Sequence, residues 1–204
     1  NGQSDQGNNL FEACPGGAPC NVLAMLNKLG RKTAFIGKVG EDQFGRLLRD
    51  TIDGFGIETK GLLLIRIHTT LAFVHTFPDG DREFSFYRKP GADMMLSESE
   101  VITIDPSVQG VPLRNPVHDD EPVRSATKKA LEAAKEAGCL ITFDPNLRPP
   151  LWDSLDHAKE MMEYGFQYCD MLKFLITDPV VTGKEDYDEG IRILQDKYQI
   201  PLIS

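Results

Sequence analysis

The sequence has no long apolar run and no excess of basic residues. Its best apolar stretch, residues 62–67, is interrupted by Arg66, whereas a helix needs about 20 apolar residues in succession to span a bilayer. The 22 lysines and arginines stand against 31 aspartates and glutamates, a net charge of −9, which argues against a chain that coats phosphate backbones or anionic lipid. We therefore expect a soluble protein with no membrane and no nucleic acid among its partners.

Disulfide and metal-binding patterns are missing as well. The four cysteines form no CxxC pair, the four histidines show no metal-ligand spacing, and no serine or cysteine lies in a nucleophile-elbow motif. We expect neither a disulfide framework nor a metal site from these residues, and a reducing, cytoplasmic location fits best. The polar start NGQSDQGNN has neither an initiator methionine nor a secretory signal, and we interpret it as a cut.

What the sequence does contain is an alternation of helix and strand patterns. Its 204 residues, 41% of them apolar, are enough for one sizeable α/β domain. Apolar residues recur at helical spacing over 18–29 and 42–55, with a short β-rich segment over 33–39 between them. We expect the first of these helices to bury one apolar face, which consists of Val22, Met25, Leu26 and Leu29.

The same alternation continues in the second half of the chain. Three helical patterns are each followed by a short apolar strand, at 139–144, 171–176 and 201–204. Repetition of helix and strand is typical of a parallel sheet covered by helices. Residues 105–122 interrupt the pattern, because four prolines punctuate a stretch without periodicity, and we expect a loop there.

A period-two pattern fills the region between residues 62 and 88. The segments LLLIRI, LAFVHTF and EFSFYR show it, and the turn signal Pro78-Asp79-Gly80 separates the last two. We expect antiparallel hairpin strands that leave the main sheet as a lid or as a dimer contact.

The last of these strands carries a first candidate for ligand binding. Alternation places Phe86 and Arg88 on one face and Tyr87 on the other, so that a flat apolar group lies beside a cation. This pair suits a sugar or a phosphate-bearing substrate. The alternative is an aromatic strand that packs on a core while Arg88 extends to water.

The segment PGGAPCN, directly before the first helix, is a second candidate. Gly16 and Gly17 let the backbone approach a ligand closely, the helix start offers unpaired N–H groups, and Asn21 carries a donor and an acceptor suited to hydroxyls. The alternative is a tight turn with a structural asparagine. The segment matches neither GxGxxG nor the P-loop pattern, which weakens a dinucleotide or P-loop interpretation.

The third candidate is FDPNLRPPLW, residues 143–152, which follows a predicted core strand. In open α/β sheets, ligands bind beyond the carboxyl ends of the strands, where Asp144, Asn146 and Arg148 would lie together. Asn146 could bind a hydroxyl and Arg148 could clamp phosphate oxygens. An Asx turn with a surface arginine is the alternative.

Taken in order, PGGAPCN, FIGKVGEDQFG, EFSFYRKPGADMML and FDPNLRPPLW resemble the motifs of the ribokinase/PfkB carbohydrate kinases, and among these the fructokinases most. The resemblance implies an α/β fold: one ribokinase-like domain over 1–204, with a doubly wound sheet covered by helices and a small antiparallel β-lid at about 62–90. Gly37, Gly40, Asp42 and Gly45 would be structural. The implied substrate-binding residues are Gly16, Gly17, Asn21, Phe86, Arg88, Asn146 and Arg148.

The resemblance also implies the cofactors and the reaction. Family members transfer the γ-phosphoryl group of ATP with the help of Mg²⁺. Their catalytic aspartate belongs to a GAGD motif that this sequence does not contain, so the catalytic residue is unknown and we expect a domain that is incomplete at both ends. The NxxE motif expected after Lys173 is absent too.

We therefore expect a kinase that phosphorylates fructose with ATP. Two alternatives stay open: a kinase for another sugar or sugar acid, such as 2-keto-3-deoxygluconate, and a non-catalytic sugar-binding module that lacks the phosphate machinery. The exposed lid strands also predict a homodimer through the lid.

Overall fold

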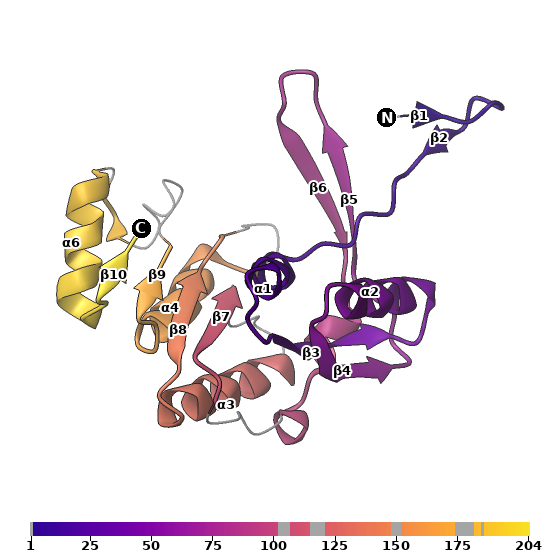
Figure 1. The fold of residues 1–204 in the computed structure, drawn as a ribbon. Helices are drawn as coiled ribbons and strands as arrows, with labels where there is room; N and C mark the ends of the chain where they lie inside the picture. Colours follow the sequence, from indigo (N-terminus) through magenta and orange to yellow (C-terminus); the bar gives the residue numbers. More distant parts are fainter. Residues whose placement is uncertain (1, 102–106, 115–120, 148–151, 174–181, 185) are drawn as a thin grey trace.

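The chain alternates helices and strands along most of its length. The computed structural model describes residues 2–101, 107–114, 121–147, 152–173, 182–184 and 186–204 (Figure 1). The first half contains β1 (Gly2–Gln3), β2 (Asn9–Leu10), α1 (Ala18–Lys28), β3 (Ala34–Gly40), α2 (Gln43–Gly54), β4 (Glu58–Ile65), β5 (Leu71–Thr76), β6 (Arg82–Tyr87) and the short helices η1 (Ala92–Met95) and η2 (Glu98–Glu100). The second half contains β7 (Gly110–Arg114), α3 (Val123–Glu136), β8 (Leu140–Asp144), α4 (Leu155–Phe166), β9 (Met171–Leu172), α6 (Tyr187–Tyr198) and β10 (Leu202–Ile203).

The second half forms a parallel sheet covered by helices. Its strand order is β10-β9-β8-β7, and all neighbouring strands are parallel. Helices lie between successive strands in the sequence, because parallel strands need a crossover connection. Phe143 of β8 and Phe166 of α4 are among the largest side chains in the core between the two layers. The predicted parallel sheet is confirmed. Among the described helices, none is both long and apolar enough to cross a membrane.

The first half has its own sheet and its own core. β3 and β4 pair in parallel, and α2, which connects them, packs on both strands. The residues of this core are Leu23, Val39, Ile52, Ile57 and Leu62. Figure 1 shows α1 between this sheet and the four-stranded sheet, and the helix contacts both β3 and β7.

The apolar face predicted for α1 is not buried. Val22, Met25, Leu26 and Leu29 are 44%, 59%, 37% and 70% exposed. The buried residue of this helix is Leu23, because α1 packs with that side against the body of the molecule. The spacing therefore predicts the helix correctly and its buried side wrongly.

Two strand predictions also need correction. Most of LLLIRI belongs to β4, which pairs in parallel with β3 and not in an antiparallel hairpin. Period-two alternation is common to both kinds of pairing and does not distinguish them. The second correction concerns the loop predicted over 105–122, because residues 110–114 form β7. Pro112 lies opposite Thr142, and β7 is the edge strand of the described sheet, where a proline without an N–H is tolerated.

Candidate functional site

The lid consists of β5 and β6, which pair in antiparallel fashion. Figure 1 shows this hairpin extending away from both sheets. Phe86 is half-buried and its ring stacks on that of Phe84, with centroids 6.0 Å apart, whereas Tyr87 is 66% exposed. The predicted hairpin and the predicted alternation between Phe86 and Tyr87 are therefore confirmed for these two strands.

Asp93 holds Arg88 at the base of the lid. The Arg88 guanidinium donates from Nε to Asp93 Oδ2 at 2.8 Å and from Nη2 to the same oxygen. Thr70 donates its hydroxyl to the other carboxylate oxygen. The side chain of Arg88 is only 14% exposed, so it lies inside the base of the lid and does not extend to water. Sequence reasoning missed Asp93, although RKPGAD places it only five residues after Arg88.

Gly16, Gly17 and Asn21 lie at the N-terminal end of α1. Gly17 is the N-cap residue with a φ of 129°, a conformation that glycine adopts without strain. Its carbonyl accepts a hydrogen bond from the backbone N–H of Asn21 at 3.1 Å. All three residues are exposed, which leaves the Asn21 side chain accessible to a ligand.

The carboxyl end of β8 carries the third candidate group. Asp144 ends the strand, and Asn146 follows with a φ of 37°, a left-handed conformation that asparagine adopts more readily than most residues. Lys173 Nζ lies 3.5 Å from Asp144 Oδ2, while Asp144 Oδ1 is buried and has no hydrogen-bond partner among the described residues. A carboxylate, an amide and an ammonium group therefore lie at one strand end. Arg148 lies outside the described residues.

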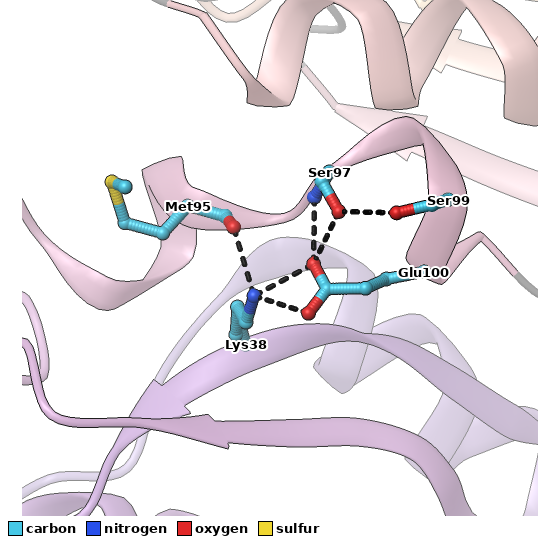
Figure 2. Close-up of polar contacts among 5 residues, drawn as sticks. All are labelled: Lys38, Met95, Ser97, Ser99 and Glu100. Carbon is cyan, nitrogen blue, oxygen red and sulfur yellow. Dashed lines mark hydrogen bonds and ion pairs between the residues drawn. The ribbon is translucent and has the colours of Figure 1, made fainter.

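A buried ion pair anchors the segment that follows the lid. Lys38 of β3 is 8% exposed and donates to both carboxylate oxygens of Glu100, at 2.6 and 2.7 Å, and to the Met95 carbonyl at 2.9 Å (Figure 2). The Ser97 amide and hydroxyl also donate to Glu100, each at 2.8 Å. The hydrogen bond from Lys38 is the main reason that the pKa of Glu100 is lowered to about 2.

A second carboxylate fixes the chain just before the lid. Asp42, the N-cap residue of α2, accepts the Gly45 amide at 2.8 Å and both the amide and the hydroxyl of Thr69 at 2.8 Å. Burial alone would raise its pKa, but these hydrogen bonds outweigh burial and lower the pKa. The Thr69 hydroxyl in turn accepts the Gly40 amide at 3.0 Å. This arrangement supports the structural role expected for Gly40, Asp42 and Gly45.

No ligand set for a metal ion is found in the part of the chain that the structure describes. Among these residues, no three His, Cys, Asp or Glu side chains gather closely enough to hold a metal. The four cysteines are free, and burial is the main reason that the pKa of Cys169 is raised to about 12.

The lid, the start of α1 and the end of β8 all fall within one match to a known family. The model for the pfkB family of carbohydrate kinases matches residues 4–197. The chain belongs to this family. The resemblance carried by the four ordered motifs is thereby confirmed, and the fold is the α/β fold of the pfkB kinases.

Curated relatives of this pfkB chain include plant fructokinases. Fructokinase-2 of Solanum lycopersicum is 41% identical over 182 residues, which cover 88% of this chain and 56% of the relative. A probable chloroplastic fructokinase-6 of Arabidopsis thaliana is 37% identical over 200 residues, which cover 95% of this chain and 52% of the relative. The chain thus spans about half the length of the curated relatives that it matches.

Solved structures similar to this pfkB chain include a bacterial fructokinase. The apo form of the Vibrio cholerae O395 enzyme superposes with a TM-score of 0.82 at 31% identity, covering 93% of this chain and 65% of that one. Its form with fructose, ADP and a calcium ion gives a TM-score of 0.83 at 30% identity, covering 98% and 64%.

Proposed function

We propose that the protein carrying this chain is an ATP-dependent sugar kinase that phosphorylates fructose. The observation that carries the proposal is the likeness of 98% of the chain to a fructokinase with fructose and ADP bound. The three candidate groups fit this reaction: an exposed asparagine for sugar hydroxyls, an aromatic ring with a fixed guanidinium at the lid, and polar groups at the end of β8.

In the proposed complex, each group has a distinct part. Asn21 would exchange hydrogen bonds with sugar hydroxyls beside Gly16 and Gly17, where the glycines leave room for close approach. Phe86 and Arg88 would cover the sugar from the lid and exclude water. Asn146 and Arg148 would lie near the reacting hydroxyl and the phosphoryl group in transfer, where a planar guanidinium matches phosphate oxygens.

The cofactors and the compartment are part of the proposal. ATP would supply the phosphoryl group, and Mg²⁺ would neutralise charge on the phosphates. Activity in the protein is then expected to disappear with excess chelator and to return with added magnesium. The cytoplasmic location stays a prediction, because one relative is named as chloroplastic.

The site assignment predicts that Asn21→Ala and Arg88→Ala each lower kcat/KM for fructose on the order of 100-fold, because each removes a group that orients the sugar. A coupled assay of ADP formation on the complete protein measures this. Asn9→Ala and Arg46→Ala, which change exposed residues of β2 and α2, serve as matched controls. Wild-type kinetics in both test variants would contradict the assignment.

Assays on the same complete protein distinguish two rival functions. A neighbour with a TM-score of 0.77 and 25% identity is aminoimidazole riboside kinase from Salmonella enterica, so kinases with this fold do not all act on fructose. A panel of sugars and sugar acids, including 2-keto-3-deoxygluconate, distinguishes these substrates. Calorimetric binding of fructose without any ADP formation would instead favour a non-catalytic sugar-binding module.

We also propose that the lid forms a homodimer contact. Aromatic rings gather on one face of the lid: Phe73 lies edge-on to Tyr87 with centroids 5.4 Å apart, and Phe11, from the segment before α1, lies edge-on to Phe73 at 5.2 Å. Phe11 is 75% exposed, and exposed apolar patches mark interaction surfaces. We expect a dimer mass by analytical ultracentrifugation and a monomer for Phe73→Glu. A monomeric wild-type protein would rule out the contact.

A further inference from the structure

The two strands of the lid are joined at their open end by one carboxylate. The last register pair of the hairpin is Leu71 with Tyr87, so Thr70 and Arg88 are the next positions on the two strands. Asp93 accepts from both, Thr70 on Oδ1 and Arg88 on Oδ2. These three residues, which we call the lid-base clasp, tie together the places where the chain enters and leaves the lid.

The clasp is itself fixed to the body of the molecule. Asp93 belongs to η1, whose first residue, Ala92, donates its amide to the His68 carbonyl at 2.9 Å. The last residue of η1, Met95, accepts from the buried ammonium of Lys38 at 2.9 Å. Asp93 therefore stands on a segment held at both ends, and it can transmit that fixed position to the lid.

Close packing leaves the clasp little freedom. A Cβ on Gly91 would collide with the Thr70 hydroxyl and would lie 2.7 Å from Asp93 Oδ1. The Arg88 side chain is largely buried, at 14% exposure, beside the carboxylate. Charge-assisted hydrogen bonds that reach one oxygen from two guanidinium nitrogens fix both the position and the plane of an arginine.

We propose that Asp93 is a positioning residue, which holds the guanidinium of Arg88 toward the sugar and sets the orientation of the lid. This inference rests on the proposed function, because it concerns the same lid and the same substrate. Asp93 acts through Arg88 and Thr70 and does not itself touch the sugar. Its loss therefore weakens sugar binding while the nucleotide part of the reaction is retained.

Steady-state kinetics of the complete protein test the effect on the substrate. Asp93→Asn is expected to raise KM for fructose about tenfold, the lower end of what a hydrogen bond to a charged group contributes, with KM for ATP within about twofold of wild type. Asp93→Glu keeps the charge and is expected to recover part of the loss. Asp50→Asn, an exposed position on α2, is the matched control. A KM for fructose that does not change, or that changes equally with KM for ATP, would overturn the proposal.

Hydrogen exchange tests the effect on the lid without any activity. In Asp93→Asn, we expect amides of β5 and β6 to exchange on the order of tenfold faster, while those of β3 and β4 stay as in wild type. Thr70→Val, which leaves the Arg88 ion pair in place, is expected to speed lid exchange with a smaller change in KM. A protein inactive on fructose refutes the proposed function, whereas lid exchange that Asp93→Asn leaves unchanged refutes the clasp.

Discussion

Replacing Gly45 with alanine is expected to destabilise the protein by about 4 kcal/mol, because overpacking and loss of a helix cap combine. A Cβ at this position would collide with the Gly40 carbonyl oxygen and would lie 3.1 Å from the Thr69 hydroxyl. Both neighbours belong to the hydrogen-bonded group around Asp42. The start of α2 would have to move away from β3, and the cap and the Thr69 contacts would be lost together.

The same helix offers a matched control. Gly54 lies at the other end of α2, and nothing comes within 4 Å of a Cβ there. Gly54→Ala is therefore expected to be neutral or to stabilise the protein by up to about 1 kcal/mol, since glycine costs conformational entropy in a helix. Urea unfolding of both variants measures the difference. Equal urea midpoints for the two variants would contradict the predicted collision at Gly45.

Removal of Glu100 is the second large effect. Glu100→Ala leaves the ammonium of Lys38 buried with only the Met95 carbonyl among the acceptors described above, and breaking a buried ion pair from one side costs about 3–5 kcal/mol. We expect about 3 kcal/mol, because the Glu100 side chain is 32% exposed. Chemical denaturation at neutral pH measures the loss.

The double variant Lys38→Met/Glu100→Leu provides the control for this loss. It removes both charges and fills the space with apolar groups. Such a replacement of a buried ion pair often changes the free energy of unfolding little. We therefore expect it to be more stable than Glu100→Ala alone. A double variant that is less stable than Glu100→Ala would contradict the explanation that the unpaired, buried ammonium of Lys38 causes the loss of stability.

The pair also predicts a dependence on pH. Because hydrogen bonds from Lys38 and, second, from Ser97 lower the pKa of Glu100 from 4.5 to about 2, the stability contributed by the carboxylate is present above about pH 4.5 and is lost as the pH falls toward 2. Lys38→Met removes the main cause of the lowered pKa of Glu100, so the acid-induced fall in stability between these values should become shallower. Unfolding midpoints of the wild type and of Lys38→Met, measured from pH 6 down to about pH 2, test this prediction.

The sequence predicts those elements whose signals come from residues close together in the chain. The strand β8 and the N-cap at Asp42 are found from short patterns, because apolar runs and capping side chains act over a few residues. The buried side of α1 is not found, since Leu23 packs on core residues such as Val39 and Leu62, which come close to it only in the folded chain. β7 itself is missed because Pro112 resembles a strand breaker until its place at a sheet edge is known.

The candidate site divides in the same way. The motifs that contain Gly16, Gly17 and Asn21 can be read directly, because each is a run of adjacent residues with a family-specific spacing. The partner of Arg88 cannot, because a spacing of five residues outside a regular helix or strand does not show that two side chains meet, and Thr70 reaches Asp93 only when the hairpin forms. Sequence alone therefore identifies the groups proposed to touch a substrate more readily than those proposed to orient them.

The two separate cores have a consequence for how the molecule responds to its ligand. One core surrounds β3 and β4, the other surrounds β8 and α4, and no strand pairing joins the two sheets in the described part of the chain. The halves meet instead through α1 on β7 and through α3 on η1 and η2, so packing, and not backbone hydrogen bonding between strands, connects them. A sugar held as proposed, by the lid on one side and by the end of β8 on the other, would add a further link between the halves and stabilise their arrangement.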